Sequence, residues 1–123
     1  MDIKNTQQDI AKNETIFGKI LRGEIPCNKV YEDDHVFAFH DIAPKAKVHV
    51  LLIPKRKIVD IASMNANDAE LVGYVLSKVS HVTTILGIQE SGFRVISNSG
   101  ADSGQEVPHL HFHILGGEAL PRL

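Results

Sequence analysis

The chain has 123 residues, of which 43% are hydrophobic and 23% charged, a composition typical of one soluble globular domain. The formal net charge of −2 gives no electrostatic reason to bind nucleic acid or an anionic membrane, so neither partner is expected. The single cysteine, Cys27, excludes an internal disulfide framework and a CxxC metal knuckle, and it favours a cytoplasmic location. Residues 1–13, MDIKNTQQDIAKN, lack the apolar run of a signal peptide. We expect them to form a polar, frayed or weakly helical arm before a single domain over residues 14–123.

The predicted elements are short strands with one short and one long helix. Apolar residues at helical spacing predict a short amphipathic helix over residues 15–22 and a long one over residues 65–87. The segment VHVLLIP is nearly all apolar, as in a central strand that is covered on both faces. This order predicts an α+β fold in which a five-stranded, mostly antiparallel sheet carries the long helix on one face. The expected strands cover residues 28–34, 35–41, 48–54, 92–98 and 109–115.

The segment PHLHFHILGG at residues 108–117 places three histidines at alternate positions. In a strand, alternate side chains share one face and lie about 6.6–7 Å apart. His109, His111 and His113 therefore share a face, and the apolar residues between them face the core. Histidine is an uncommon residue, so three on one face of a short strand call for an explanation.

Three interpretations of this histidine face are open on the residues alone. One is a half-buried strand with a polar face. A second is a zinc site, in which two of the histidines are joined by His49, His40 or Asp41. A third is nucleophilic catalysis at phosphorus, which a neutral imidazole performs when an acceptor holds its other nitrogen as N–H. The preceding loop, NSGADSGQEVP, favours catalysis because small residues let backbone N–H groups surround a phosphate.

The histidine pattern belongs to a longer resemblance. HLHFHIL matches the histidine-triad pattern His-φ-His-φ-His-φ-φ, in which φ is apolar. Together with TIFGKILRGEIP, VYEDDHVFAFHDIAPKAKVHVLLIPK and SGADSGQEVPHLHFHILGG, it is similar to the Hint branch of the HIT superfamily from Glu14 to Gly117. The resemblance implies an α+β homodimer with a ten-stranded sheet, a purine nucleotide substrate and no cofactor. It implies a phosphoramidase that cleaves the P–N bond of AMP or GMP linked to an amine, with related activity on aminoacyl-adenylates.

The resemblance also implies a role for each site residue. His111 matches the nucleophile that forms a nucleotidyl-histidine, and His113 matches the histidine that contacts the phosphate and the leaving group. His109 and His49 match the network that holds the nucleophile's ring in its tautomer. Asp41 matches the carboxylate that grips the ribose hydroxyls. The phosphate-side loop comprises Asn98, Gly104, Gln105, Glu106 and Val107, and the purine pocket comprises Ile16, Phe17, Phe39, His40 and Ile42.

Several positions depart from the family pattern. Residues 15–18 read TIFG where many bacterial relatives carry a Cys-x-x-Cys that binds structural zinc, so no metal is expected. Glu106 stands where animal relatives carry a serine, and Pro108 replaces an aromatic residue that is often found before the triad. These departures bear on the choice of substrate.

Two other functions stay open. One is a dinucleoside polyphosphate hydrolase of the Fhit branch, although TIFGKI and the LGG after the triad favour Hint. The other is a nucleotide-binding regulatory protein with minor catalysis, against which the complete triad speaks.

Overall fold

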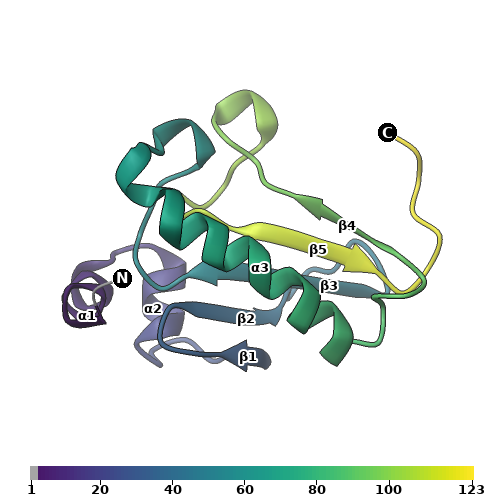
Figure 1. The fold of residues 1–123 in the computed structure, drawn as a ribbon, viewed down its shortest axis with the longest axis horizontal. Helices are drawn as coiled ribbons and strands as arrows, with labels where there is room; N and C mark the ends of the chain where they lie inside the picture. Colours follow the sequence, from purple (N-terminus) through teal and green to yellow (C-terminus); the bar gives the residue numbers. More distant parts are fainter. Residues whose placement is uncertain (1–2) are drawn as a thin grey trace.

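A computed structural model describes residues 3–123 of the chain, with side chains from Asn5 onward. Five strands form one sheet in the order β1-β2-β3-β5-β4, and each neighbouring pair is antiparallel (Figure 1). The predicted α+β class and five-stranded antiparallel sheet are confirmed. The strands are β1 (Lys29–Glu32), β2 (Val36–His40), β3 (Val48–Pro54), β4 (Phe93–Ile96) and β5 (Phe112–Gly116).

Three α-helices accompany the sheet in the described part of the chain. The long helix α3 (Ala69–Ile85) lies across one face of the sheet, and α1 (Ile3–Lys12) and α2 (Ile16–Leu21) lie together at one end of the molecule (Figure 1). Within the segment expected to be a frayed or weakly helical arm, residues 3–12 form a helix of 10 residues, and Met1 and Asp2 lie outside the described residues. Arg22 contributes to its order because Nη1 of Arg22 donates a hydrogen bond of 2.9 Å to the carbonyl of Ile10 in the last turn. No helix among residues 3–123 has the length and hydropathy needed to cross a bilayer.

The two faces of the sheet bury separate apolar clusters, and alternation along β2 shows how. Val36 and Ala38 point toward α3, whereas Phe37 and Phe39 point toward α2. The central strand β3 contributes to both clusters, which confirms the prediction that it is covered on both faces. The face that carries α2 is the one that holds the candidate site.

The last strand begins three residues later than the sequence predicts, at Phe112 rather than at His109. Pro54 ends the neighbouring strand β3, and its carbonyl accepts a hydrogen bond from the ring of His109 instead of from a backbone amide. The regular ladder therefore starts only at the pair Leu52 and Phe112. The alternation nevertheless holds, because the apolar residues between the histidines lie in the α3-side cluster: Leu110, Phe112 and Ile114.

Candidate functional site

A cavity of about 940 Å³ opens on the face of the sheet that carries α2. Three of the four histidines expected to act in catalysis line it, namely His49, His111 and His113. Each stands on or directly beside a central strand, so the sheet backbone holds its position. The fourth, His109, does not line the cavity.

His111 presents one defined ring nitrogen to the cavity. Its Nδ1 lies 2.7 Å from the backbone carbonyl oxygen of His109. Because a carbonyl oxygen only accepts, Nδ1 carries the proton and donates it, and the neutral ring keeps its lone pair on Nε2. The side chain is almost buried, at 6% exposed, and the edge of Phe17 packs against it with ring centroids 5.0 Å apart. This is the arrangement that a histidine nucleophile requires.

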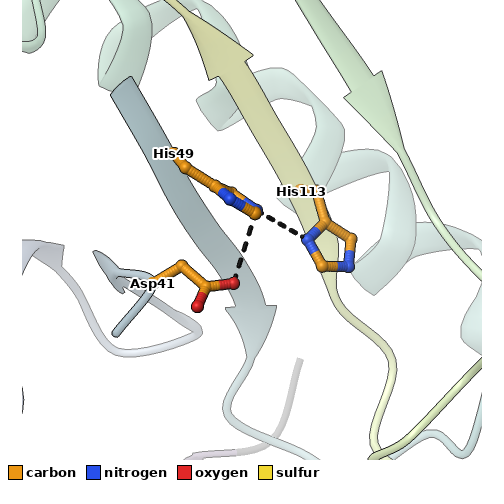
Figure 2. A group of neighbouring side chains, drawn as sticks. All are labelled: Asp41, His49 and His113. Carbon is orange, nitrogen blue, oxygen red and sulfur yellow. Dashed lines mark hydrogen bonds and ion pairs between the residues drawn. The ribbon is translucent and has the colours of Figure 1, made fainter. Parts of the chain in front are cut away.

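A second series of hydrogen bonds fixes the ring of His113 (Figure 2). The backbone N–H of Lys45 donates to Nδ1 of His49 at 3.0 Å, so the proton of His49 is on Nε2. That N–H donates to Nδ1 of His113 at 2.9 Å, and the Asp41 carboxylate lies 3.4 Å from the same nitrogen. His113 is therefore left with its own proton on Nε2. This series of hydrogen bonds leaves the Nε2–H of His113 as a donor beside the lone pair of His111. The ring centroids of His111 and His113 are 5.1 Å apart.

The rings of His49 and His113 are both held neutral. Burial, and to a smaller extent the neighbouring His111 and His49, lower the pKa of His113 to about 4. Burial also lowers the pKa of His49, against the opposing charge of Asp41. At neutral pH, His113 therefore acts as a hydrogen-bond donor and not as a cation.

The same three side chains, Asp41, His49 and His113, offer ligand atoms that all lie within 4.8 Å of one another, as in some metal sites. Two nitrogens bound to tetrahedral zinc, each about 2.0–2.1 Å from the ion, are roughly 3.3 Å apart. The separation of 2.9 Å between His49 Nε2 and His113 Nδ1 is shorter than this. The geometry is that of a hydrogen bond between two neutral rings.

His109 turns its ring into the protein and uses both nitrogens there. The side-chain amide of Asn13 donates to Nδ1 at 2.9 Å, and Nε2–H donates to the carbonyl of Pro54 at 2.8 Å. The ring is completely buried, and burial lowers its pKa to about 4. The resemblance implied that His109 and His49 belong to the network that holds the nucleophile's tautomer. In the structure the backbone carbonyl of His109 does so, and His49 bonds to His113 instead.

The residues expected in the purine pocket all line the cavity. Phe17 and Phe39 are buried and meet edge to face, with centroids 5.7 Å apart. Ile42 is fully exposed, at 101%, on the connection that follows β2. These residues give the cavity an apolar part of its lining, to which all five contribute: Ile16, Phe17, Phe39, His40 and Ile42.

The loop before the triad lines the cavity next to the histidines, with one exception. Asn98, Gly104, Glu106 and Val107 line the cavity, whereas Gln105 does not. The Gln105 side chain accepts from the N–H of Gly100 and donates to two carbonyls, those of Val59 and Val107. Gln105 therefore stabilises the loop by hydrogen bonds and does not face the cavity.

Several residues of the site were not singled out from the sequence. Leu51 and Leu115 line the cavity, and each follows a site histidine by two positions on the same strand, so strand periodicity could have found them. Asn13 carries a weaker signal, because an asparagine two residues before a threonine is typical of a turn in which its side chain accepts from the later N–H. Its contact with His109 has no local signal.

The comparisons with known proteins identify the family of the chain. The model of the HIT domain family matches residues 22–120. The chain belongs to the HIT domain family, which confirms the superfamily to which the sequence resemblance points.

Similar proteins match nearly the whole chain. An uncharacterized HIT-like protein of Azospirillum brasilense is 49% identical over 107 residues, which cover 85% of this chain and 87% of that protein. Another, from Helicobacter pylori, is 48% identical over 103 residues, covering 84% and 96%. A solved HIT family hydrolase from Clostridium thermocellum superposes with a TM-score of 0.86 at 40% identity, covering 90% of this chain and 96% of that one. A histidine triad protein from Clostridium difficile gives 0.84 at 44% identity, covering 88% and 94%.

The lowered pKa values make stability depend on pH. His109 and His113 have pKa values of about 4 in the folded chain against an ordinary 6.5. Between these values the unfolded chain binds more protons, so the free energy of unfolding is highest above pH 6.5 and falls as the pH decreases toward 4. Urea unfolding across this range measures the dependence. The variant His113→Gln removes one of the two groups and should show a shallower dependence, and an unchanged slope would contradict the assignment.

Proposed function

We propose that the protein hydrolyses purine nucleoside 5′-phosphoramidates through a nucleotidyl-histidine intermediate and releases AMP or GMP. The observation that carries the proposal is the hydrogen bond of 2.7 Å from His111 Nδ1–H to the carbonyl of His109. It directs the lone pair of Nε2 into a cavity with a partly apolar lining and a glycine-containing loop. The similarity to solved HIT family hydrolases supports hydrolysis as the class of reaction.

In the first step His111 Nε2 attacks the α-phosphorus. An N–P bond forms, the P–N bond to the amine breaks, and its electron pair stays on the amine nitrogen. In the second step water attacks the same phosphorus, the bond to His111 breaks with its electron pair returning to Nε2, and the nucleoside monophosphate leaves while the proton of the water passes to solvent. The carbonyl of His109 stabilises the ring throughout, because the positive charge that develops on the imidazole is shared with Nδ1–H.

We assign His113 the role of a hydrogen-bond donor toward the phosphoryl oxygen or the departing nitrogen. Its Nδ1 already accepts from His49, so Nε2–H is the group that it presents. Its low pKa, about 4, favours donation by a neutral ring over storage of a proton. The substrate nitrogen is protonated before the P–N bond breaks, so it departs as a neutral amine.

The remaining residues suit the rest of a nucleotide. The edge-to-face rings of Phe17 and Phe39 give apolar surface for a purine. The Asp41 carboxylate lines the same cavity beside His49, accepts from the N–H of Ala43 through one oxygen and retains lone pairs for ribose hydroxyls. The loop that contains Gly104 lies where it can offer backbone N–H groups to the phosphate.

The variant His111→Ala tests the nucleophile. Because it removes the attacking nitrogen and leaves the apolar lining intact, kcat should fall about a thousandfold or more while AMP still binds. Steady-state hydrolysis of adenosine 5′-phosphoramidate and calorimetric binding of AMP measure the two properties. The matched control is His81→Ala on the exposed side of α3, which should keep wild-type turnover. Near-full turnover by His111→Ala would remove the assignment, and faster turnover of diadenosine triphosphate by the wild type would favour the Fhit-like alternative.

Two variants at His113 separate hydrogen bonding from acid catalysis. Glutamine keeps an N–H donor and alanine does not, so His113→Gln should retain more of kcat than His113→Ala, which should lose about 10²–10³. Hydrolysis of a phosphoramidate and of a p-nitrophenyl nucleotide ester, whose leaving group needs no proton, should show the same order. Equal loss in both variants, confined to the phosphoramidate, would indicate that His113 delivers a proton.

We also propose that two copies of the chain pair along β4 into a ten-stranded sheet. This strand is an edge of the sheet, and its Phe93 and Val95 side chains are 36% and 37% exposed, which is unusual for an unpartnered edge. Sedimentation velocity should give a dimer for the wild type and a monomer for Val95→Lys. The control Ile61→Lys, at a residue 46% exposed outside the sheet, should remain dimeric. A monomeric wild type would contradict the proposal.

A further inference from the structure

We propose that Asn13, which lies between α1 and α2, is a positioning residue for His111. Its side-chain amide fixes the ring of His109 and thereby the carbonyl that selects the tautomer of His111. The catalytic consequence rests on the proposed function, whereas the effect on the two histidine rings does not. Nothing in the sequence around Asn13 indicates this role, because His109 is 96 positions away.

The orientation of the Asn13 amide follows from its neighbours. Its Oδ1 accepts two hydrogen bonds from Thr15, one from the backbone N–H at 3.0 Å and one from the hydroxyl at 2.8 Å. The nitrogen Nδ2 is therefore the atom that faces His109, and it donates to Nδ1 of that ring at 2.9 Å. The His109 proton must then be on Nε2, where it is donated to the carbonyl of Pro54.

The surroundings of Asn13 are tightly packed. The side chain is only 2% exposed. Its backbone carbonyl accepts from Nη1 of Arg22 at 2.5 Å, which ties it to the end of α2. A Cβ atom at Gly18 would overlap that carbonyl and would lie 2.6 Å from the Cβ of Asn13, so the first turn of α2 needs a glycine here. This packing leaves Asn13 one position for its amide.

The fixed ring of His109 has two effects on the nucleophile. Hydrogen bonds on opposite sides of the ring hold residue 109, so its carbonyl oxygen is in place for His111 Nδ1–H. The Asn13 donor also opposes a second proton on His109, because a proton on Nδ1 would face an N–H group. A cation next to His111 would withdraw electron density from the attacking ring. Phe17, whose edge packs against both rings with centroids 5.7 and 5.0 Å away, fills the space between them and α2.

Asn13→Asp tests the inference with minimal change of shape. The carboxylate still accepts from Thr15 but cannot donate to His109, so His109 should take a second proton in spite of its burial. Asp9, Lys57 and His111 are the other titratable groups that act on this ring, and the variant leaves them in place. Nitrogen-15 NMR of the histidine rings at pH 7 should show a neutral His109 protonated on Nε2 in the wild type and a doubly protonated His109 in the variant.

The kinetic expectation for Asn13→Asp is a fall in kcat of about tenfold or more with KM little changed, because substrate contacts are intact and the nucleophile is not. Asn65→Ala is the control. It removes a side chain that caps the short helix Ala66–Asp68 by accepting from Asn67 N–H, and Asn65 does not line the cavity. It should lower the melting temperature while kcat and the ring spectra stay at their wild-type values.

Several outcomes would overturn the inference. Wild-type ring spectra for His109 and His111 in Asn13→Asp would do so, and so would equal losses of kcat in Asn13→Asp and Asn65→Ala, which would reduce Asn13 to a structural residue. If the wild-type protein does not hydrolyse phosphoramidates, the proposed function fails. In that case the NMR comparison alone still decides whether Asn13 sets the protonation of these rings.

Discussion

The hydrogen bond from His111 Nδ1–H to the carbonyl of His109 decides which nitrogen of the central histidine faces the cavity. The rest of the site depends on that choice. A free lone pair on Nε2 is what makes His111 a nucleophile, and the opposite tautomer would present an inert N–H. The bond joins residues two positions apart, so it needs the backbone of residues 109–111 to stay out of the regular β-ladder. The early end of β3 at Pro54 and the late start of β5 at Phe112 provide that irregular segment.

Three histidines of one pattern thus have three environments. His109 is enclosed and bonded at both nitrogens, His111 is bonded at one and open at the other, and His113 accepts from His49 and presents its N–H. The difference comes from the acceptor or donor that each ring meets, since the residue type is the same. Lowered pKa values for His109 and His113, about 4 for each, keep both rings neutral beside the nucleophile. The proposed reaction uses these differences.

The sequence predicts the sheet, the long helix and the shared histidine face, because apolar periodicity is a local signal that burial enforces. Ile114 and Phe112 lie in the core as expected. The sequence does not predict that Gln105 stabilises the loop or that the His109 ring turns inward, because both follow from contacts with distant backbone carbonyls. Asn13 is the extreme case, since its partner is 96 positions away. At positions 15 and 18, where the resemblance implies zinc-binding cysteines in many relatives, this chain has a helix cap and a glycine that admits Asn13.

The most direct test of the account is detection of the covalent intermediate. Purified protein is mixed with excess adenosine 5′-phosphoramidate, quenched within milliseconds at alkaline pH, where phosphohistidine bonds survive, and analysed by peptide mass spectrometry. The account predicts an adenylyl group on the peptide that contains His111, attached to that residue and lost on longer incubation as AMP appears. AMP release at the same rate with no adduct on any histidine would indicate direct attack of water on the substrate and would contradict the account.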